Sequence, residues 1–230
     1  MSVAPQPGDL TASATLVRRP AQELLHGCVA IQESGGGWVR PQRFSDVQIR
    51  ALGSVSAWHP GLYRAMARAT AGISLELETD SSELALELQL DPEPTGTRAV
   101  LDHVSKPVTV GVGGKMSVGD TTPLPHDGFG IEVDGRLRMP VMPQLGTRTL
   151  SLCVDDPEKS PAAGVTQLPG LGAAHRVRIW LPCLRGCALR SVVGNGTKIE
   201  ALPMRRQLLV LGDSIAQGFV CGDPGQSWPA

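Results

Sequence analysis

The sequence predicts a mainly β protein, in which an N-terminal β-sandwich with short helices is followed by the first strand and helix of an α/β domain. Three observations lead to this prediction. Between residues 70 and 200, apolar and polar residues alternate over several short segments, which is typical of strands with one buried face. The 27 Gly and 19 Pro residues indicate many turns. The unbroken apolar run Leu208–Leu211 then favours a strand buried on both faces, as in a parallel sheet.

The first 70 residues predict little regular structure. Residues 1–25 are rich in Pro, Ala, Ser and Thr without periodicity, and predict a loose N-terminal arm. Glu33–Gly37, with three consecutive glycines, predicts a turn. Ser45 is a favourable N-cap and Gly53 a favourable stop, so we expect a short helix between them. A second short helix is predicted after Pro60.

Two hairpins are predicted in the sandwich. Residues 73–79 and 84–90 place Ile and Leu at alternate positions with Glu mostly between them, and the polar turn Asp80–Ser82 joins them, so we expect a hairpin with one wet face. Asp134-Gly135 is a strong two-residue turn signal between the apolar positions of residues 131–133 and 137–139. Further strands are predicted over residues 148–154, 175–182 and 188–193. The sandwich domain, with its short helices, is thus expected over residues 26–203, and the start of an incomplete second domain over residues 204–230.

The composition disfavours several classes of partner. Hydrophobic residues make up 41% of the 230 residues and charged residues 19%, with a formal net charge of -1. This is enough apolar material for a buried core. A near-neutral chain has no electrostatic attraction to nucleic acid or anionic lipid, and no run of about 18 apolar residues is present that would span a bilayer. We therefore expect neither nucleic acid nor a membrane as partner.

The cysteines favour a reducing compartment. There are five, an odd number, in a chain too long to need disulfides for stability. No basic segment followed by an apolar one begins the sequence, so no secretory signal is predicted and the cytoplasm is the expected location. Cys183 and Cys187 form a C-x-x-x-C pair, but no second Cys or His pair lies at the spacing of a zinc finger. A pair of buried or incidental thiols is the alternative, and we predict neither metal nor cofactor.

Gly212-Asp213-Ser214 is the segment with the most specific chemistry. A buried strand that ends at Gly212 and delivers Ser214 to the first turn of a helix would hold the hydroxyl at the carboxyl edge of a sheet, where ligands bind in α/β folds. Free N–H groups at the helix N-terminus favour an oxyanion beside that hydroxyl. This is how a serine nucleophile is mounted. Spacing alone equally allows Asp213 or Ser214 to be a simple helix cap.

The longer string LLVLGDSIAQGF, residues 208–219, resembles the first conserved block of the SGNH hydrolases, also called GDSL esterases and lipases. The resemblance implies a flavodoxin-like α/β hydrolase domain in which Ser214 is the nucleophile and its backbone N–H is one oxyanion donor, with Gly212 and Asp213 completing the motif. A sandwich, here jelly-roll-like, that leads directly into such a block is similar to carbohydrate esterase family 2. That likeness implies removal of acetyl groups from sugars, or from a similar small acyl ester.

The sequence departs from this family in two ways. Ala216 stands where Thr is frequent, which is a minor change. No His follows Ser214, whereas the family supplies its catalytic His, its Asp and two further oxyanion residues downstream of the serine. Without a base, a serine is a weak nucleophile. We therefore expect the N-terminal part of a longer esterase, inactive by itself.

Two other functions remain open at this stage. One is a non-catalytic carbohydrate-binding or scaffolding sandwich in which the motif is vestigial. The other is a lipase or thioesterase that acts on longer acyl chains. The four tryptophans would stack on sugar rings or, more simply, pack in the core; they are Trp38, Trp58, Trp180 and Trp228.

Overall fold

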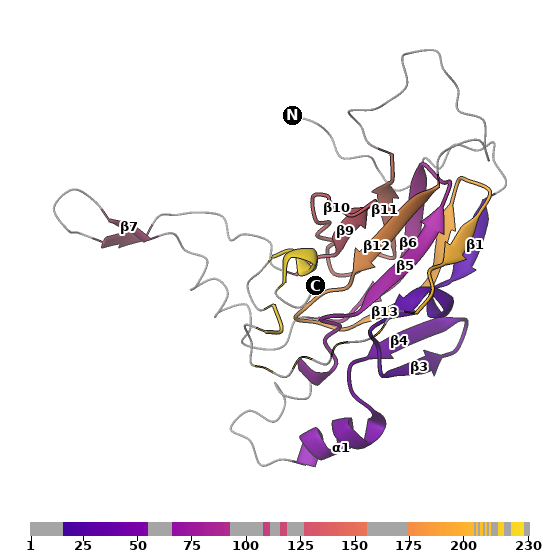
Figure 1. Cartoon of the computed structure of the whole chain (residues 1–230). Coiled ribbons are helices and arrows are strands. Elements are labelled where there is room, and N and C mark those ends of the chain that lie inside the picture. The colour runs from indigo at the N-terminus through magenta and orange to yellow at the C-terminus, as the bar shows by residue number, and fades with distance from the viewer. Residues whose placement is uncertain are drawn as a thin grey trace.

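The computed structural model describes residues 16–54, 66–92, 108–110, 116–118, 127–155 and 174–204, and beyond these residues 206, 208, 210, 212, 216–218 and 222–227. Within this part of the chain the fold is mainly β, as predicted (Figure 1). It contains two antiparallel sheets of six strands each and a two-stranded ribbon, β7 (Val108–Val110) with β8 (Met116–Val118). Over the same residues, no helix has both the length and the apolar character needed to cross a membrane.

The first sheet has the strand order β11-β6-β13-β4-β3, and β1 also pairs with β13. Its strands are β1 (Val17–Pro20), β3 (Ala30–Ser34), β4 (Trp38–Gln42), β6 (Glu83–Leu90), β11 (Thr149–Cys153) and β13 (Cys187–Gly194). The second sheet has the order β10-β9-β12-β5-β14, and β2 also pairs with β5. Its strands are β2 (Leu25–His26), β5 (Ser74–Thr79), β9 (Gly130–Val133), β10 (Arg136–Leu137), β12 (His175–Trp180) and β14 (Ile199–Ala201).

The two sheets share one hydrophobic core, which makes the molecule a β-sandwich. Side chains alternate between the two faces of a strand, so every second residue of each strand points inward. In the first sheet the inward residues include Leu84, Leu86 and Leu88 of β6, and in the second Leu75 and Leu77 of β5; all five are completely buried. These two rows of leucines meet from opposite sheets and form the centre of the core.

The predicted hairpin between residues 73–79 and 84–90 is wrong, although both segments are strands. β5 pairs with β2, β12 and β14 in the second sheet, and β6 pairs with β11 and β13 in the first. The turn Asp80–Ser82 therefore carries the chain from one sheet to the other. A hairpin and a crossing between sheets both direct alternate leucines into one interior, so the alternation cannot distinguish them. The expected wet face is also partly absent, because Glu76 is buried and pairs with Arg178 at 3.0 Å.

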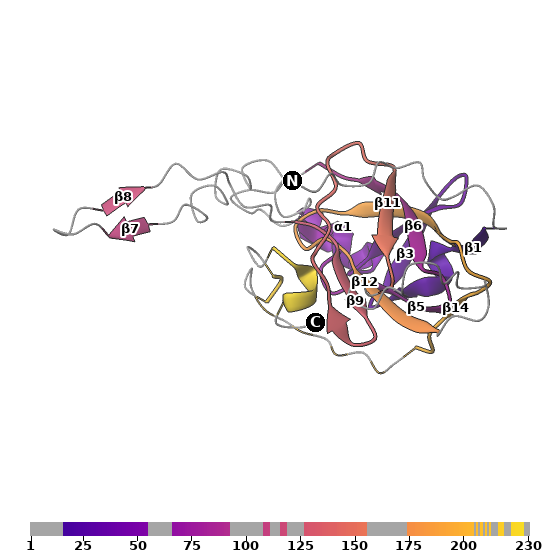
Figure 2. The same ribbon diagram turned by 90° about the horizontal axis from the view of Figure 1, so that it is seen from above.

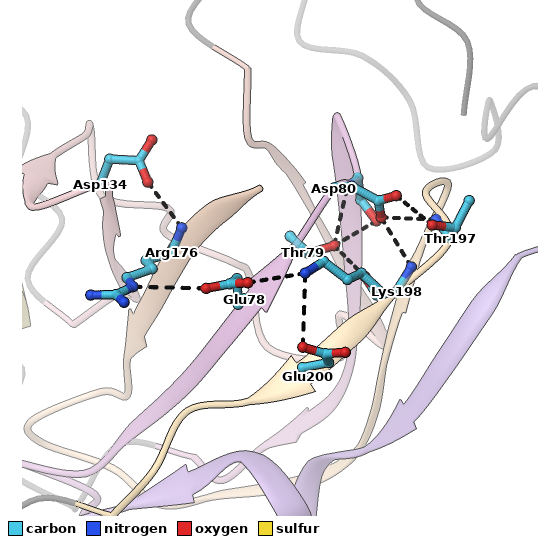
Figure 3. Close-up of polar contacts among 9 residues, drawn as sticks. Glu78, Thr79, Asp80, Asp134, Arg176, Thr197, Lys198 and Glu200 are labelled. Carbon is cyan, nitrogen blue, oxygen red and sulfur yellow. Dashed lines mark hydrogen bonds and ion pairs between the residues drawn. The ribbon is translucent and has the colours of Figure 1, made fainter. Parts of the chain in front are cut away.

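Hydrogen bonds hold this sheet-crossing turn against the loop between β13 and β14 (Figure 3). The Asp80 carboxylate accepts hydrogen bonds from the backbone N–H groups of Thr197 and Lys198, at 2.8 and 3.0 Å, and from the Thr197 hydroxyl. Desolvation by itself raises the pKa of Asp80, but these hydrogen bonds outweigh it and lower the pKa below its ordinary 3.8. The Lys198 ammonium lies between Glu78 and Glu200, at 3.0 and 3.8 Å. The crossing is thus held by its polar contacts as well as by the leucines.

The other predicted strands are confirmed. β9 and β10 form the predicted hairpin, with Arg136 opposite Val133 and with Asp134 and Gly135 at φ 51° and 76°, the positive values that a type I′ turn requires. β11, β12 and β13 lie within the segments predicted over residues 148–154 and 175–182 and around residues 188–193.

The loose arm predicted over residues 1–25 is wrong for its last part. β1 pairs with β13 along four residues, from Val17 opposite Gly194 to Pro20 opposite Ser191. The 3-10 helix η1 (Ala21–Leu24) follows and buries Ala21 and Leu24 completely. The strand was not recognisable because Val17-Arg18-Arg19-Pro20 has no apolar alternation; its pairing comes from β13. Residues 1–15 lie outside the described part of the chain.

Two further predictions for this region hold in part. The turn at Glu33–Gly37 is confirmed, but the strands β3 and β4 on either side of it were not predicted. α1 (Asp46–Ser54) is the predicted helix, and Ser45 and Gln48 form a capping box: the Ser45 N–H donates to the Gln48 side chain at 2.9 Å, and the Gln48 N–H donates to the Ser45 hydroxyl at 3.4 Å. The helix predicted after Pro60 falls mostly on residues outside the described ones.

Candidate active site

The connection between β12 and β13, residues 181–186, is a part of the sandwich that Gln217 contacts, three residues after Ser214 in the chain. Leu181 and Leu184 in it are buried, and Asp127 holds it in place. One Asp127 carboxylate oxygen accepts the Leu184 N–H at 2.9 Å, while the other lies 3.1 Å from Nε of Arg185. Arg185 also donates to the Asp127 backbone carbonyl at 2.9 Å. A buried ion pair with these extra hydrogen bonds gives the connection one conformation.

The residues predicted to form the motif are only partly described. Asp213 and Ser214 lie outside the described residues, so their predicted roles remain predictions. Gly212 is described, and a Cβ atom at this position would collide with the side chain of Ala216. The backbone of Gly212 therefore lies directly against Ala216, and a residue with a Cβ atom does not fit at position 212 without a shift.

Gln217 joins the turn at residues 216–218 to the sandwich. Its side-chain N–H donates to the backbone carbonyl of Cys183 at 2.8 Å, within the β12–β13 connection. The sequence did not indicate this contact, because a lone Gln in a helix-like segment carries no positional signal. The residues that the structure brings together are thus Gly212, Ala216, Gln217 and the connection that Asp127 and Arg185 hold.

The strand predicted over Leu208–Leu211 is not formed at its described residues. Leu208 and Val210 belong to no strand, and the Leu208 side chain is 84% exposed. A strand of this kind needs parallel neighbours on both sides, and the two described six-stranded sheets of the sandwich are antiparallel throughout. Among the described residues there is no parallel sheet for this run to join, and the Leu208 side chain is therefore exposed to solvent.

A second contact anchors the chain after the motif. η3 (Pro224–Gln226) lies beside β9 in both views (Figures 1 and 2). Asp223 caps it, accepting the Gly225 N–H at 2.8 Å, and is itself buried. A Cβ atom at Gly130 of β9 would lie 2.5 Å from the Asp223 carboxylate and 2.6 Å from the Gly225 nitrogen. Gly130 thus permits the close approach by which this segment docks on the second sheet.

The described histidines do not supply a base for this segment. His175 pairs with Asp134 at 2.8 Å and lies at the start of β12. Gly225 lies beside Leu137 of β10 and beside Trp180, which is at the other end of β12. At about 3.3 Å per residue, the two ends of this strand are roughly 17 Å apart. His26 is buried in β2. The other three histidines lie outside the described residues.

The thiols of the C-x-x-x-C pair are unsuited to chemistry. Cys183 and Cys187 are buried, and neither is in a disulfide. Complete burial raises the pKa of Cys187 to about 12, so it stays protonated at neutral pH. Within the described part of the chain, no group of three or more His, Cys, Asp or Glu side chains is arranged to hold a metal ion.

Comparison with known proteins gives only distant likenesses. No protein-family model matches the sequence, and no curated protein matches it. Among solved structures, a salicylyl-acyltransferase, SsfX3, from a tetracycline biosynthetic pathway is 22% identical, with a TM-score of 0.47, over 79% of this chain and 39% of that one. A protein described as a GDSL-like lipase, from Bacteroides ovatus, is 16% identical, with a TM-score of 0.49, over 94% and 52%. A family two carbohydrate esterase from Cellvibrio japonicus is 13% identical, with a TM-score of 0.46, over 90% and 42%.

The chain thus spans between 39% and 52% of the lengths of these three proteins. Their sequence identities are low and their TM-scores lie below the level at which two folds are taken as equivalent. These likenesses therefore establish no activity for this chain, and the function has to be argued from its own residues.

Proposed function

We propose that the chain is the N-terminal part of an SGNH-type serine esterase, which removes an acetyl or similar small acyl group from a carbohydrate. The observation on which this rests is the Gly212-Asp213-Ser214 motif, which follows an apolar run and begins at a glycine packed against Ala216. The close approach of Gly212 to Ala216 supports the proposal, because a nucleophile has to be presented by a backbone that cannot shift.

In this proposal Ser214 attacks the ester carbonyl through its hydroxyl oxygen. Its proton passes to a His that an Asp orients, both supplied by sequence after residue 230, and its backbone N–H stabilises the oxyanion. The tetrahedral intermediate collapses to an acyl-serine and releases the sugar hydroxyl, which takes the proton from the His. Water then hydrolyses the acyl-serine and regenerates the free serine.

The sandwich has a mechanical role in this proposal. The Cys183 carbonyl binds Gln217 at 2.8 Å, three residues after the nucleophile, and Gly130 receives the segment that follows. These two contacts, both after the nucleophile in the chain, fix the segment that follows it to the sandwich. The partly buried Cys28 and the buried Cys183 and Cys187 are in no disulfide. Such thiols are what a cytoplasmic protein would carry, and we include that location in the proposal.

The proposal is tested with the full-length protein and 4-nitrophenyl acetate. Ser214→Ala should lower kcat by at least about 1,000-fold, because no other group replaces the nucleophile. Ser227→Ala is the matched control. The Ser227 hydroxyl lies in the same C-terminal segment, and it donates a local hydrogen bond to the Pro224 carbonyl at 2.8 Å. It should retain most of the activity. Absence of turnover by the wild type, or an unchanged rate in Ser214→Ala, would show that the chain is not a serine esterase.

Chain-length preference separates the acetyl-esterase proposal from a lipase or thioesterase. An acetyl-specific pocket rejects long chains sterically, so 4-nitrophenyl octanoate should be hydrolysed at least tenfold more slowly than the acetate. Faster hydrolysis of the octanoate than of the acetate would keep the serine mechanism but would favour a lipase or thioesterase over an acetyl esterase.

A further inference from the structure

A groove lined largely by polar side chains lies on the first sheet. Its volume is about 680 Å³, within the range of roughly 300–1,000 Å³ that small-molecule sites occupy. It is lined by residues of β3 and β4, by the first half of α1, by Arg68, by Asp91 and Pro92 directly after β6, and by residues 185–187. Its lining is mainly Arg, Gln and Asp rather than the apolar side chains that line a lipid site.

Hydrogen bonds and close packing hold several of the lining residues in place. Arg40 donates to both carboxylate oxygens of Asp91 at 2.8 Å, and the Asp91 N–H donates to the Gly186 carbonyl at 3.0 Å. A Cβ atom at Gly186 would lie 2.7 Å from both the Arg68 carbonyl and the Asp91 carboxylate, so these three residues pack as closely as a glycine allows. Because these residues are already held in place, a ligand that binds here does not have to offset the entropy cost of ordering them.

The groove has an excess of positive charge. Of its four arginines, Arg40 is matched by Asp91, and Arg185 by Asp127. Arg50 and Arg68 are exposed and, among the described residues, make no ion pair or side-chain hydrogen bond. A single carboxylate, that of Asp46, is the remaining acidic group of the lining. Two guanidinium groups are thus available to bind an oxyanion, which their planar donor pattern suits.

Neutral hydrogen-bonding groups lie beside these arginines. In the β3–β4 pair, Gln32 is opposite Arg40 and Ser34 is opposite Trp38, so these four side chains share one face of the ribbon. Gln42, two residues after Arg40, lies on the same face and donates to Gln32 at 3.3 Å. Amides and a hydroxyl are the usual partners of sugar hydroxyls, and the half-buried Trp38 presents an indole at the end of this row.

We propose that this groove binds an anionic sugar, with Arg50 and Arg68 on its carboxylate or phosphate and the β3–β4 face on its hydroxyl groups. The two oxyanions share the same arginine chemistry, and the experiment distinguishes them. None of the residues that line the groove belongs to the motif, so the proposal does not depend on esterase activity. It would hold an acidic carbohydrate on the sandwich whether or not the following domain cleaves an ester.

The test is calorimetric titration of the 230-residue chain with trigalacturonate, glucose 6-phosphate and the neutral xylotriose. At least one anionic sugar should bind and xylotriose should bind at least tenfold more weakly. The variant Arg50→Ala/Arg68→Ala should raise the Kd of that anionic sugar by about tenfold or more, because each lost charged hydrogen bond is worth roughly that factor. Arg136→Ala is the matched control: Arg136 is exposed on β10 of the other sheet, and its loss should leave the Kd unchanged.

Each outcome decides between alternatives. Binding of trigalacturonate alone identifies a sugar carboxylate, and binding of glucose 6-phosphate alone a sugar phosphate. Equal affinity for xylotriose, an unchanged Kd in the Arg50/Arg68 variant, or binding of none of the three probes would overturn the proposal. Arg50 and Arg68 are exposed and make no contact that holds the fold, and circular dichroism of the variant checks that a loss of binding is not a loss of structure. A Ser214→Ala chain should bind like the wild type, which keeps this result independent of the proposed hydrolysis.

Discussion

Removing the charge of Asp127 should destabilise the whole sandwich. The Asp127 side chain is 2% exposed and that of Arg185 is 10% exposed, so the ion pair is almost fully removed from water. Asp127→Asn keeps the size of the side chain and the acceptor for the Leu184 N–H, but it leaves the Arg185 guanidinium buried without a counter-charge. Such a loss costs about 3–5 kcal/mol. Because domains are stable by only about 5–15 kcal/mol, this is a large share of the total.

Urea unfolding followed by circular dichroism measures this loss, and a double-mutant cycle identifies its cause. Arg185→Met alone leaves a buried carboxylate, and the double variant Asp127→Asn/Arg185→Met leaves no buried charge. The double variant should therefore be more stable than the sum of the two single losses predicts, by about 1 kcal/mol or more. If Asp127→Asn loses less than about 1 kcal/mol, or if the two losses simply add, the ion pair is not what holds the β12–β13 connection.

Three other predictions concern separate parts of the molecule. Gly130→Ala places a methyl group against Asp223 and Gly225, so limited proteolysis should cut after residue 220 faster than in the wild type, and an unchanged digestion rate would contradict the docking of η3. Because folding lowers the pKa of Asp80 from 3.8, its hydrogen bonds stabilise the fold above about pH 4 and are lost as the pH falls through the lowered value. Asp80→Asn should flatten the acid side of the stability profile, and an unaltered profile would assign acid unfolding to other groups. Iodoacetamide at pH 8 should label the exposed Cys153 in the native protein and Cys187 only after denaturation, because Cys187 is buried and its pKa is raised to about 12. Mass spectrometry identifies the labelled residues, and modified Cys187 in the native protein would refute this prediction.

The sequence predicted most strands because their signals are local. The Asp134-Gly135 turn requires positive φ at both residues, and few pairs other than Asn-Gly and Asp-Gly adopt it readily. The Ser45 cap is local in the same sense, since its partner Gln48 is three residues away. Features of this kind are complete within a few residues, and no distant part of the chain is needed to interpret them.

The pairing of strands and the surroundings of the motif could not be predicted in this way. Which sheet β5 and β6 join depends on β12 and β13, about a hundred residues further on. β1 becomes a strand because β13 offers it an edge, although its own sequence has no alternation. Similarly, Gln217 and Gly130 gain a role only from the partner that the fold brings to them. Long-range contacts of this kind leave no periodic signal in a single sequence.

The pairing of β1 with β13 also has a consequence for the order in which the protein folds. Val17 lies opposite Gly194 of the first sheet, and Arg19 donates to the Ile199 carbonyl of the second at 3.0 Å, so the sandwich closes only when segments some 180 residues apart meet. β13 lies inside the first sheet, between β6 and β4. Until β13 has been synthesised, the side of β6 that faces the middle of the sheet has no strand to pair with. On the ribosome, the leucine rows of β5 and β6 would emerge well before their cover. We expect slow, late closure of the sandwich, with these two strands exposed to aggregation during the interval.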